Sequence, residues 1–438
     1  MFNRGLLLLL AMILAGCGAM ANQPTTSSTN PTSIPTIFVN STPTMVASTP
    51  TLAATNPTTA AITPTLEATN PTTATISNPQ SGEEVLAFIR QNPSNVSLVS
   101  YSTNSDGSIN NADPLIEFNA EQPLPLASTM KIVILASYAQ AVEAGTLDPE
   151  QPISLADWEA WYWPNTDGGA HPAALERLGI PADQRGFAND PAQTVPLKTL
   201  AQAMIFESDN AATDYLIDRL GLPALDQTIK DLGMQQQTKI VPIVGLFLLV
   251  MNPDASIDAT SMQSLLELDQ ASIEQQAVAL AERYQAEPEW RKATQDQTEL
   301  KLDLAQQSQV FDHIMPKGSA GDYANVMALV GNNQLISPAV SQTMREFLEW
   351  PMTIPGNETM FTHFGTKGGS LPGMLTEAMF IQPAQGEWAD RTKVVVLFFN
   401  QLPDQTWLGL MQSFMQQQFA VQLALDPAFA QSVASELK

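Results

Sequence analysis

Three short motifs contain the residues whose types and spacing could do chemistry. The first is Ser-Thr-Met-Lys at 128–131, the second is Ser-Asp-Asn at 208–210, and the third is Lys-Gly-Gly at 367–369. Each motif by itself is common, because a serine followed by a lysine three residues later arises by chance in many proteins. Their occurrence together, in this order along one chain, makes Ser128 a candidate nucleophile with lysines that could activate it.

The first motif has the parts of an activated nucleophile. A serine hydroxyl attacks poorly until a nearby base accepts its proton. Residues three apart share one face of a helix, so Lys131 can reach the Ser128 hydroxyl. A lysine that is buried beside other cations loses its proton more readily, and its amine can then act as that base. At a helix N-terminus, free backbone N–H groups and the positive end of the dipole favour an oxyanion at Ser128.

Together the motifs resemble the S-x-x-K, S-D-N and K-T-G set of the class A β-lactamase and penicillin-binding superfamily. The resemblance covers the chain from Ala87 to the C-terminus. It implies an α+β fold, with an antiparallel sheet built from both chain ends and a helical subdomain. It also implies hydrolysis of β-lactam amides through an acyl-Ser128 intermediate, with no cofactor and no metal.

The resemblance assigns roles to the other motif residues. Ser208 would pass a proton to the leaving nitrogen, and Asn210 would hold the acyl amide. Lys367 would supply positive charge at a substrate carboxylate and orient Ser208. Gly369 would line the substrate site, and the backbone N–H of Ser370 would be the second oxyanion donor.

Two of these motifs also have structural interpretations that involve no catalysis. Serine, aspartate and asparagine all favour helix N-caps, so the motif at 208–210 is also typical of a helix start. Lys367 is also typical of a solvated lysine at the end of a strand. The presence of all three motifs favours the catalytic interpretation.

The third motif departs from the family pattern. Gly368 stands where the family has a threonine, so the hydroxyl that the family uses to hold the substrate carboxylate is missing. Thr366 or Ser370 could compensate for it. Recognition of a free carboxylate is therefore an open question at this point.

A second departure concerns deacylation. Class A β-lactamases carry a glutamate on a loop after S-D-N that activates water, but residues 239–248 contain no acid. Glu287 and Glu207 are two weak substitutes. Glu287 is more typical of a helix start or kink, and we expect Glu207 to face away from the site. Slow deacylation is the expected consequence.

Two segments are longer than the family spacing. The first carries the aromatic residues Trp158, Trp161, Tyr162 and Trp163. We interpret these as core or as a packed loop, with a lid over Ser128 as the alternative. The second, residues 258–309, is rich in Ala, Gln, Glu and Leu, and we expect a solvated helical addition on the surface.

Hydrophobic periodicity places these motifs on regular elements. We expect the following helices: 83–91, 128–144, 196–205, 211–220 and 404–419. We expect the following strands: 95–103, 115–119, 363–371, 375–382 and 392–400. Strands from both ends around a helical middle predict an α+β domain in which helices cover one sheet.

The N-terminal region predicts location rather than fold. An apolar stretch over 6–14 precedes Leu-Ala-Gly and Cys17, which resembles the lipobox of bacterial lipoproteins. We therefore expect a signal peptide over 1–16, lipidation at Cys17 and a Thr/Pro/Ser/Asn-rich disordered tether over 17–82. The hydrolase domain would span 83–438. The protein would then be extracytoplasmic and anchored by lipid to the bacterial cell membrane.

Composition excludes several function classes. A net charge of −25 makes nucleic acid an unsuitable partner. Cys17 is the only cysteine, which excludes an internal disulfide and a Cys-based metal site. The three histidines, His171, His313 and His363, lack the spacing of zinc ligands.

Two other functions stay open beside that of a β-lactamase-like enzyme. One is a D,D-peptidase that acts on cell-wall peptides, or an esterase of the same fold. The other is a non-catalytic surface module, against which the pairing of Ser128 with Lys131 argues. We expect the protein to be a monomer with a small-molecule β-lactam or a cell-wall peptide as its substrate.

Overall fold

A computed structural model describes residues 76–438 apart from 252, 256, 298–299 and 390. Cys17 and the predicted signal peptide lie outside the described residues, as does the tether up to residue 75. The residues just before the first helix already contact the domain, because Ile76 packs against its core and Thr406 donates a hydrogen bond to the Ser77 carbonyl. Among the described residues, no helix has both the length and the apolar character needed to cross a bilayer.

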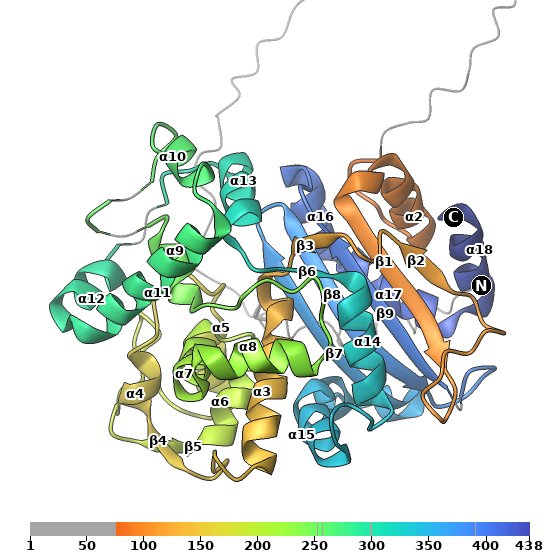
Figure 1. The fold of residues 1–438 in the computed structure, drawn as a ribbon, viewed down its shortest axis with the longest axis horizontal. Helices are drawn as coiled ribbons and strands as arrows, with labels where there is room; N and C mark the ends of the chain where they lie inside the picture. Colours follow the sequence, from red (N-terminus) through yellow and green to blue (C-terminus); the bar gives the residue numbers. More distant parts are fainter. Residues whose placement is uncertain (1–75, 252, 256, 298–299, 390) are drawn as a thin grey trace, which may run out of the picture.

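One five-stranded antiparallel sheet forms the centre of the fold, in the order β2-β1-β9-β8-β7 (Figure 1). Its strands are β1 (Val96–Thr103), β2 (Ile116–Phe118), β7 (Phe361–Leu371), β8 (Met374–Pro383) and β9 (Thr392–Phe399). Strands from the two ends of the chain pair directly, since β1 lies beside β9. The predicted α+β class and the sheet built from both chain ends are confirmed.

The sheet is buried on both faces, and β9 shows why. Successive side chains of a strand point to opposite faces, so a strand covered on both sides must be apolar throughout. Every residue of β9 is buried. Alternate residues join two different cores, one containing Val394, Val396 and Phe398 and the other containing Val395, Leu397 and Phe399.

Helices from both chain ends cover one face of the sheet. They are α2 (Gly82–Gln91), α16 (Asp404–Ser413), α17 (Met415–Leu425) and α18 (Pro427–Glu436). The predicted single helix over 404–419 is wrong. The helix breaks at Phe414, whose φ of 54° lies in the left-handed region, and a separate helix begins at Met415.

The other face of the sheet packs against α14 (Ala320–Gly331), which contacts β1, β8 and β9. Beyond it lies the helical region on the left of Figure 1. Its helices are α3 (Lys131–Glu143), α4 (Leu155–Glu159), α5 (Ala170–Arg177), α6 (Leu197–Phe206), α7 (Asn210–Leu220), α8 (Leu222–Asp231), α9 (Ile243–Leu248) and α15 (Pro338–Leu348).

Short elements connect these parts. Two small antiparallel pairs join β3 (Pro123–Pro125) to β6 (Lys317–Ser319) and β4 (Pro152–Ser154) to β5 (Thr194–Pro196). Single 3₁₀ turns are η1 (Pro93–Asn95), η2 (Ala127–Met130), η3 (Trp350–Thr353) and η4 (Asn357–Thr359). The predicted helix over 128–144 therefore begins as a 3₁₀ turn and becomes α-helical only at Lys131.

The segment 258–309 is not the solvated surface addition that its composition suggested. It forms α10 (Met262–Leu266), α11 (Gln270–Ala286), α12 (Pro288–Gln295) and the start of α13 (Leu304–Ile314). One face of α11 is apolar and packs against α9, with the side chains of Ile273, Ala277, Ala281 and Tyr284 buried in the main core. The many polar residues of α11 occupy its other face.

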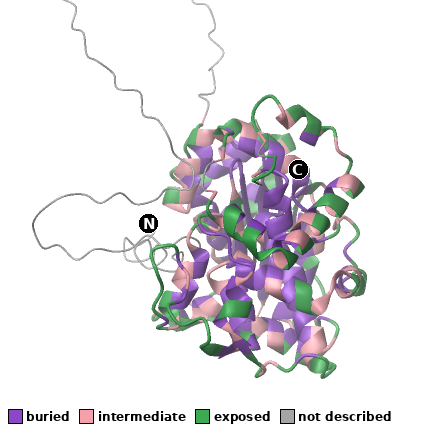
Figure 2. Cartoon of the chain, turned by 90° about the vertical axis from the view of Figure 1, so that its left-hand side faces the viewer, coloured by how far each residue is buried: buried purple, intermediate pink, exposed green. Residues whose placement is uncertain are grey.

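The aromatic segment belongs to the core. Trp158, Trp161, Tyr162 and Trp163 are all buried, and Trp158 is completely so. In Figure 2, buried residues are drawn in purple, and they extend through the interior of the helical region. The interpretation as core is confirmed, and the alternative of a lid over Ser128 is not.

Candidate active site

Ser128 lies in η2, a turn that is fixed to the central sheet. Thr129, next to it, shares a 2.8 Å hydrogen bond with Thr376 of β8. The Thr376 hydroxyl also donates to the Leu126 carbonyl at 2.9 Å. Ser128 itself is half-buried. Within the described part of the chain, its hydroxyl has no hydrogen-bond partner, which leaves the oxygen available for attack.

The third motif lies directly against this turn. A Cβ atom at Gly369 would lie 2.5 Å from the Ser128 amide nitrogen and 2.9 Å from the Leu126 carbonyl oxygen. Real Cβ atoms do not approach backbone atoms so closely, so only glycine fits at this position. The structure thus brings Gly369 of edge strand β7 to the nucleophile.

Lys131 joins the first motif to the second. Its ammonium is completely buried and donates to the Ser208 carbonyl at 2.6 Å and to Asn210 Oδ1 at 2.8 Å. It also donates to Ser208 Oγ at 3.2 Å. The sequence predicted that Lys131 reaches Ser128, whereas in the described part of the chain the Lys131 side chain donates its hydrogen bonds to the second motif. Catalytic hydrogen bonds often tighten only when substrate is present.

Ser208 connects all three motifs. Lys367 also donates to Ser208 Oγ, at 3.0 Å, and to the Gly368 carbonyl at 2.7 Å. A hydroxyl oxygen accepts two hydrogen bonds, and its own proton stays free for a third partner. Ser208 has a φ of 69°, a conformation that costs energy for a residue with a Cβ. These ammonium contacts hold it there.

The environment of Lys131 favours its neutral form. Burial, and next the charge of Lys367, lower the pKa of Lys131 from 10.5 to about 7, although Asp209 and Asp214 oppose the shift. Loss of solvent disfavours the ammonium, and a neighbouring cation disfavours it further. A substantial fraction of Lys131 is therefore a free amine near neutral pH, as a general base requires.

Asp209 attaches the second motif to the aromatic segment. Its Oδ1 accepts a hydrogen bond from the Ala212 amide and caps α7. The helix N-cap predicted for the motif at 208–210 is therefore present. Its Oδ2 lies 2.8 Å from Nδ1 of His171, a completely buried histidine of α5. The His171 Nε2 lies 3.5 Å from a Glu159 oxygen. The ring packs between Trp158 and Tyr162.

His171 is therefore held as an imidazolium. Burial by itself lowers the pKa of His171, but the charge of Asp209, the hydrogen bond to Asp209 and the nearby Glu159 carboxylate outweigh burial. They raise the pKa from 6.5 to about 9. Asp167 adds to the shift, and it also accepts a hydrogen bond from the His171 amide at 2.8 Å.

We expect His171→Phe to lower the free energy of unfolding by about 3–5 kcal/mol, because it leaves buried carboxylates without their cation. Since folding raises the pKa of His171, its contribution is full below pH 6.5 and is lost as pH rises through about 9. Urea unfolding at these two pH values should therefore give a smaller difference between variant and wild type at the higher one. His313→Phe, at a half-buried histidine, is the control. If the difference in unfolding free energy between variant and wild type did not change with pH, the assignment of His171 as an imidazolium would be contradicted.

The loop that lacks an acid is held by a buried aspartate. Asp214 of α7 accepts hydrogen bonds from the amides of Ile243 at 2.6 Å and Val244 at 2.8 Å. Burial raises the pKa of Asp214 from 3.8 to about 7, against the effect of these amides and of Lys131. Residues 240–250 are buried in turn. The segment thus packs beside the site without presenting a carboxylate from its own residues.

Neither substitute glutamate reaches the site. Glu207 forms an ion pair with Arg177 of α5, with Nη2 at 3.1 Å from its carboxylate. Glu287 is an exposed residue at the start of α12 and pairs with Arg283. The expectation that Glu207 faces away and that Glu287 begins a helix is confirmed.

No neighbouring hydroxyl replaces the one missing at Gly368. The Ser370 hydroxyl contacts Met411 and accepts a hydrogen bond at 3.2 Å from the indole N–H of Trp407 in α16. The Thr366 hydroxyl donates to Glu377. Both side chains point to the C-terminal helices, away from Ser208. Residues two apart on a strand share a face, so Thr366 and Ser370 lie on the same face as residue 368. Both hydroxyls are engaged by other groups there, and neither supplies a free donor in place of the missing one.

Three residues near the site were missed by sequence reasoning, namely His171, Asp214 and Glu377. All three are titratable and almost completely buried. Charged residues are rarely buried without a partner, but burial is not visible in the sequence of a single chain. The only available signal was that Asp214 interrupts the apolar face of its helix.

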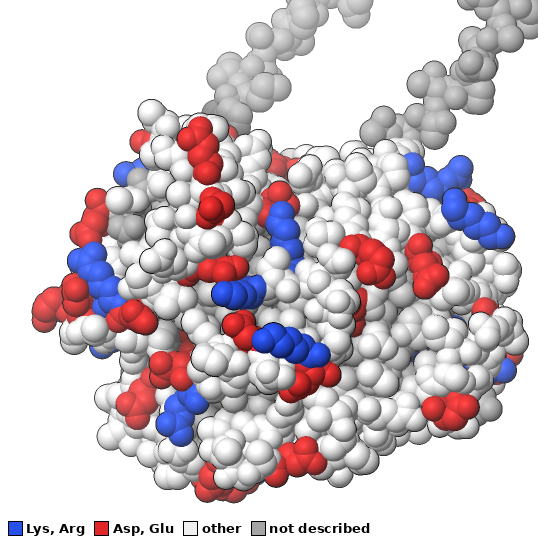
Figure 3. All heavy atoms as spheres, viewed as in Figure 1, with Lys and Arg blue, Asp and Glu red and all other residues white. Residues whose placement is uncertain are grey.

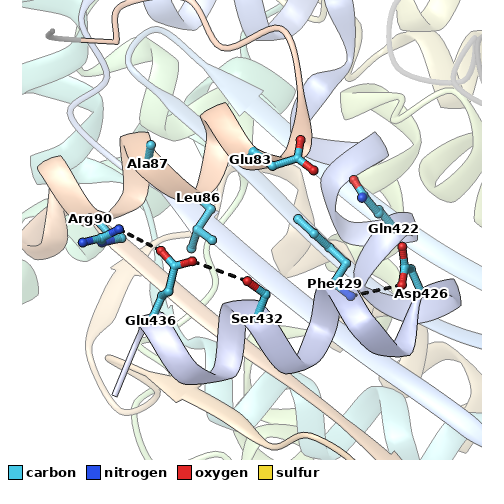
Figure 4. Close-up of a pocket in the computed structure, with 9 residues that line it drawn as sticks. All are labelled: Glu83, Leu86, Ala87, Arg90, Gln422, Asp426, Phe429, Ser432 and Glu436. Carbon is cyan, nitrogen blue, oxygen red and sulfur yellow. Dashed lines mark hydrogen bonds and ion pairs between the residues drawn. The ribbon is translucent and has the colours of Figure 1, made fainter. Parts of the chain in front are cut away.

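A surface groove of about 560 Å³ lies elsewhere, between α2 and the C-terminal helices (Figure 4). An ion pair between Arg90 and Glu436, 2.7 Å apart, crosses it, and Leu86 and Phe429 line it. None of the motif residues lies in this groove. Acidic side chains are scattered over the face shown in Figure 3 and do not gather at one point.

Comparison with known proteins identifies the relatives of this fold. Residues 80–400 match the β-lactamase enzyme family. Among solved structures, a β-lactamase from Sphaerobacter thermophilus DSM 20745 is 19% identical, with a TM-score of 0.46 over 78% of this chain and 96% of that one. PBP-A is 15% identical, with a TM-score of 0.42 over 79% and 99% of the two chains. A comparison with curated proteins gives no match.

Proposed function

Because the chain belongs to the β-lactamase enzyme family, we propose that it is a serine hydrolase that opens β-lactam amides through an acyl-Ser128 intermediate. The observation that carries the proposal is that Ser208 Oγ lies within hydrogen-bond distance of the side-chain nitrogens of both Lys131 and Lys367. Lys131 lies 3.2 Å from this oxygen and Lys367 lies 3.0 Å from it. One hydroxyl thereby links the base beside the nucleophile to the strand that lines the substrate.

Acylation begins with proton transfer from Ser128 to the neutral amine of Lys131. The Ser128 oxygen then bonds to the lactam carbonyl carbon, and the carbonyl oxygen becomes an oxyanion. The amides of Ser128 and Ser370 donate to this oxyanion. Preorganised donors of this kind typically contribute about 10²–10³-fold in rate each.

Breakdown of the tetrahedral intermediate needs a proton at the leaving nitrogen. Ser208 gives its proton to that nitrogen as the carbon–nitrogen bond breaks, and it recovers a proton from Lys131. Lys367 keeps the Ser208 oxygen oriented. Asn210 accepts from Lys131 through Oδ1, so its amide N–H groups remain for the acyl side chain of the substrate.

Hydrolysis of the acyl-enzyme is the slow part of the proposed cycle. A water molecule needs a base to attack the ester at Ser128, and the segment 239–248 offers no carboxylate. Asp214 lies beneath that segment with its oxygens engaged by two amides. We infer that the acyl-enzyme persists.

The pH profile of acylation tests this function. The rate constant for acylation by penicillin G, measured by intact mass, should rise with pH around a midpoint near the Lys131 pKa of about 7. The rise reflects the amine, which is the form that accepts the Ser128 proton. Lys131→Met should remove the rise together with nearly all of the rate. A flat profile, or no adduct at Ser128 at any pH, would contradict the proposal.

We also propose that a lipid on Cys17 anchors the domain outside the cytoplasm. Cys17→Ala should prevent incorporation of radiolabelled palmitate and release the protein from the membrane fraction. The control is Ser27→Ala, which leaves the lipobox intact. Equal incorporation in wild type and Cys17→Ala would contradict the assignment.

A further inference from the structure

The third motif has a buried carboxyl group behind it. In the register of β7 and β8, Gly368 pairs with Glu377. Residues that face each other across an antiparallel pair point to the same side of the sheet. A Cβ atom at Gly368 would lie 2.9 Å from Glu377 Oε2. The carboxyl group of Glu377 thus occupies the space into which a side chain at 368 would extend.

The Glu377 carboxyl is held firmly in this place. Its Oε1 accepts from the Thr366 hydroxyl, and its Oε2 accepts from Gln417 of α17 at 2.9 Å. The side chain is only 2% exposed. Burial raises the pKa of Glu377 above its usual value, whereas the hydrogen bonds from Thr366 and Gln417 and the charge of Lys367 lower it. The Lys367 ammonium itself donates to Ser208. The Glu377 carboxyl therefore accepts hydrogen bonds from two neutral side chains, while the nearby cation, Lys367, donates to Ser208.

This arrangement weakens the site for anions in two ways. Gly368 has no side chain, so residue 368 offers no hydroxyl or other side-chain donor. The ionised form of the Glu377 carboxyl, behind the strand, also offsets the field of Lys367 where a substrate anion would lie, and little solvent is present to screen it. Lys367 then orients Ser208 without strongly attracting a ligand carboxylate.

We infer that Glu377 is a specificity-determining residue that directs this site toward acyl donors without a free carboxylate beside Lys367, such as esters or amide-capped substrates. The inference deepens the proposed function and rests on acylation of Ser128. Glu377 acts through its field and through the space that it takes, since the strand separates it from the substrate.

A matched pair of substrates tests this inference. The probes are penicillin G and its methyl ester, which differ only at the carboxylate, and intact mass gives the rate constant for acylation of Ser128 in the full chain. Wild type should react with the ester at least as fast as with the acid. Glu377→Gln keeps the shape of the side chain and should raise the rate with the acid about tenfold, with no change for the ester.

The control is Glu117→Gln, which removes one negative charge at an exposed position of β2. It should leave both rate constants unchanged. A wild-type rate that is tenfold faster with the acid, or an equal effect of Glu377→Gln on both probes, would overturn the inference and leave the proposed function intact. If neither probe acylates Ser128, the proposed function fails and the inference fails with it. If Glu377→Gln does not fold, the ratio of the wild-type acylation rate constants for the acid and the ester still tests the inference.

Discussion

Replacing Ser128 by alanine should abolish covalent labelling of the protein by a fluorescent penicillin or a fluorophosphonate. Ser128 lies three residues before Lys131, in the turn that packs against Gly369. Without the oxygen no acyl bond forms, so we expect complete loss of signal rather than a reduced rate. Gel fluorescence after incubation of equal amounts of wild type and Ser128→Ala with the probe measures the labelling.

The same variant should keep its fold. Ser128 is half-buried, and its hydroxyl has no hydrogen-bond partner in the described part of the chain. A substitution away from packed or bonded groups usually changes stability by about 0.5 kcal/mol or less. Ser432→Ala, in the C-terminal helix α18, is the control and should be labelled as wild type. Labelling of Ser128→Ala at another serine would refute the whole site.

Penicillin G should leave the enzyme trapped as its acyl adduct. We expect one equivalent of product in a burst, followed by slow turnover, with the mass of one penicillin retained on the protein. General-base assistance typically contributes about 10²–10⁴-fold in rate. The segment 239–248 supplies no such base. An intact-mass time course after removal of free penicillin gives the rate of release.

Two variants locate any base that remains. Glu207→Gln should not change the release rate, because its carboxylate is paired with Arg177. Asp214→Asn tests the buried carboxyl beside the segment, and a further slowing would identify Asp214 as the source of the residual rate. Rapid steady turnover without an adduct would contradict slow deacylation and would place an efficient base at Lys131 or another group.

The sequence by itself determined the family and the outline of the site. The motifs at 128–131, 208–210 and 367–369 are local patterns, and the structure brings all three together around Ser208. The sheet strands were predicted to within a few residues, because apolar runs such as β9 are recognisable without tertiary information. The absence of an acid from 239–248 is likewise a property of the sequence alone.

Tertiary structure decided what surrounds these motifs. The break at Phe414 and the packing of α11 depend on neighbours that are remote in sequence. His171 was one of three scattered histidines until folding placed it 2.8 Å from Asp209. Its charge comes from burial and from the carboxylates around it, and neither is encoded by local spacing.

At the third motif, the sequence and the tertiary structure determine clearly different properties. From the sequence, Gly368 was a missing hydroxyl that Thr366 or Ser370 could replace. Strand alternation and the β7–β8 register instead turn both hydroxyls toward the C-terminal helices and bring Glu377 behind the glycine. Pairing between strands joins residues through backbone hydrogen bonds whose partners no local pattern specifies. The sequence therefore determined which residues could react, and only the tertiary structure decided which charges act on them.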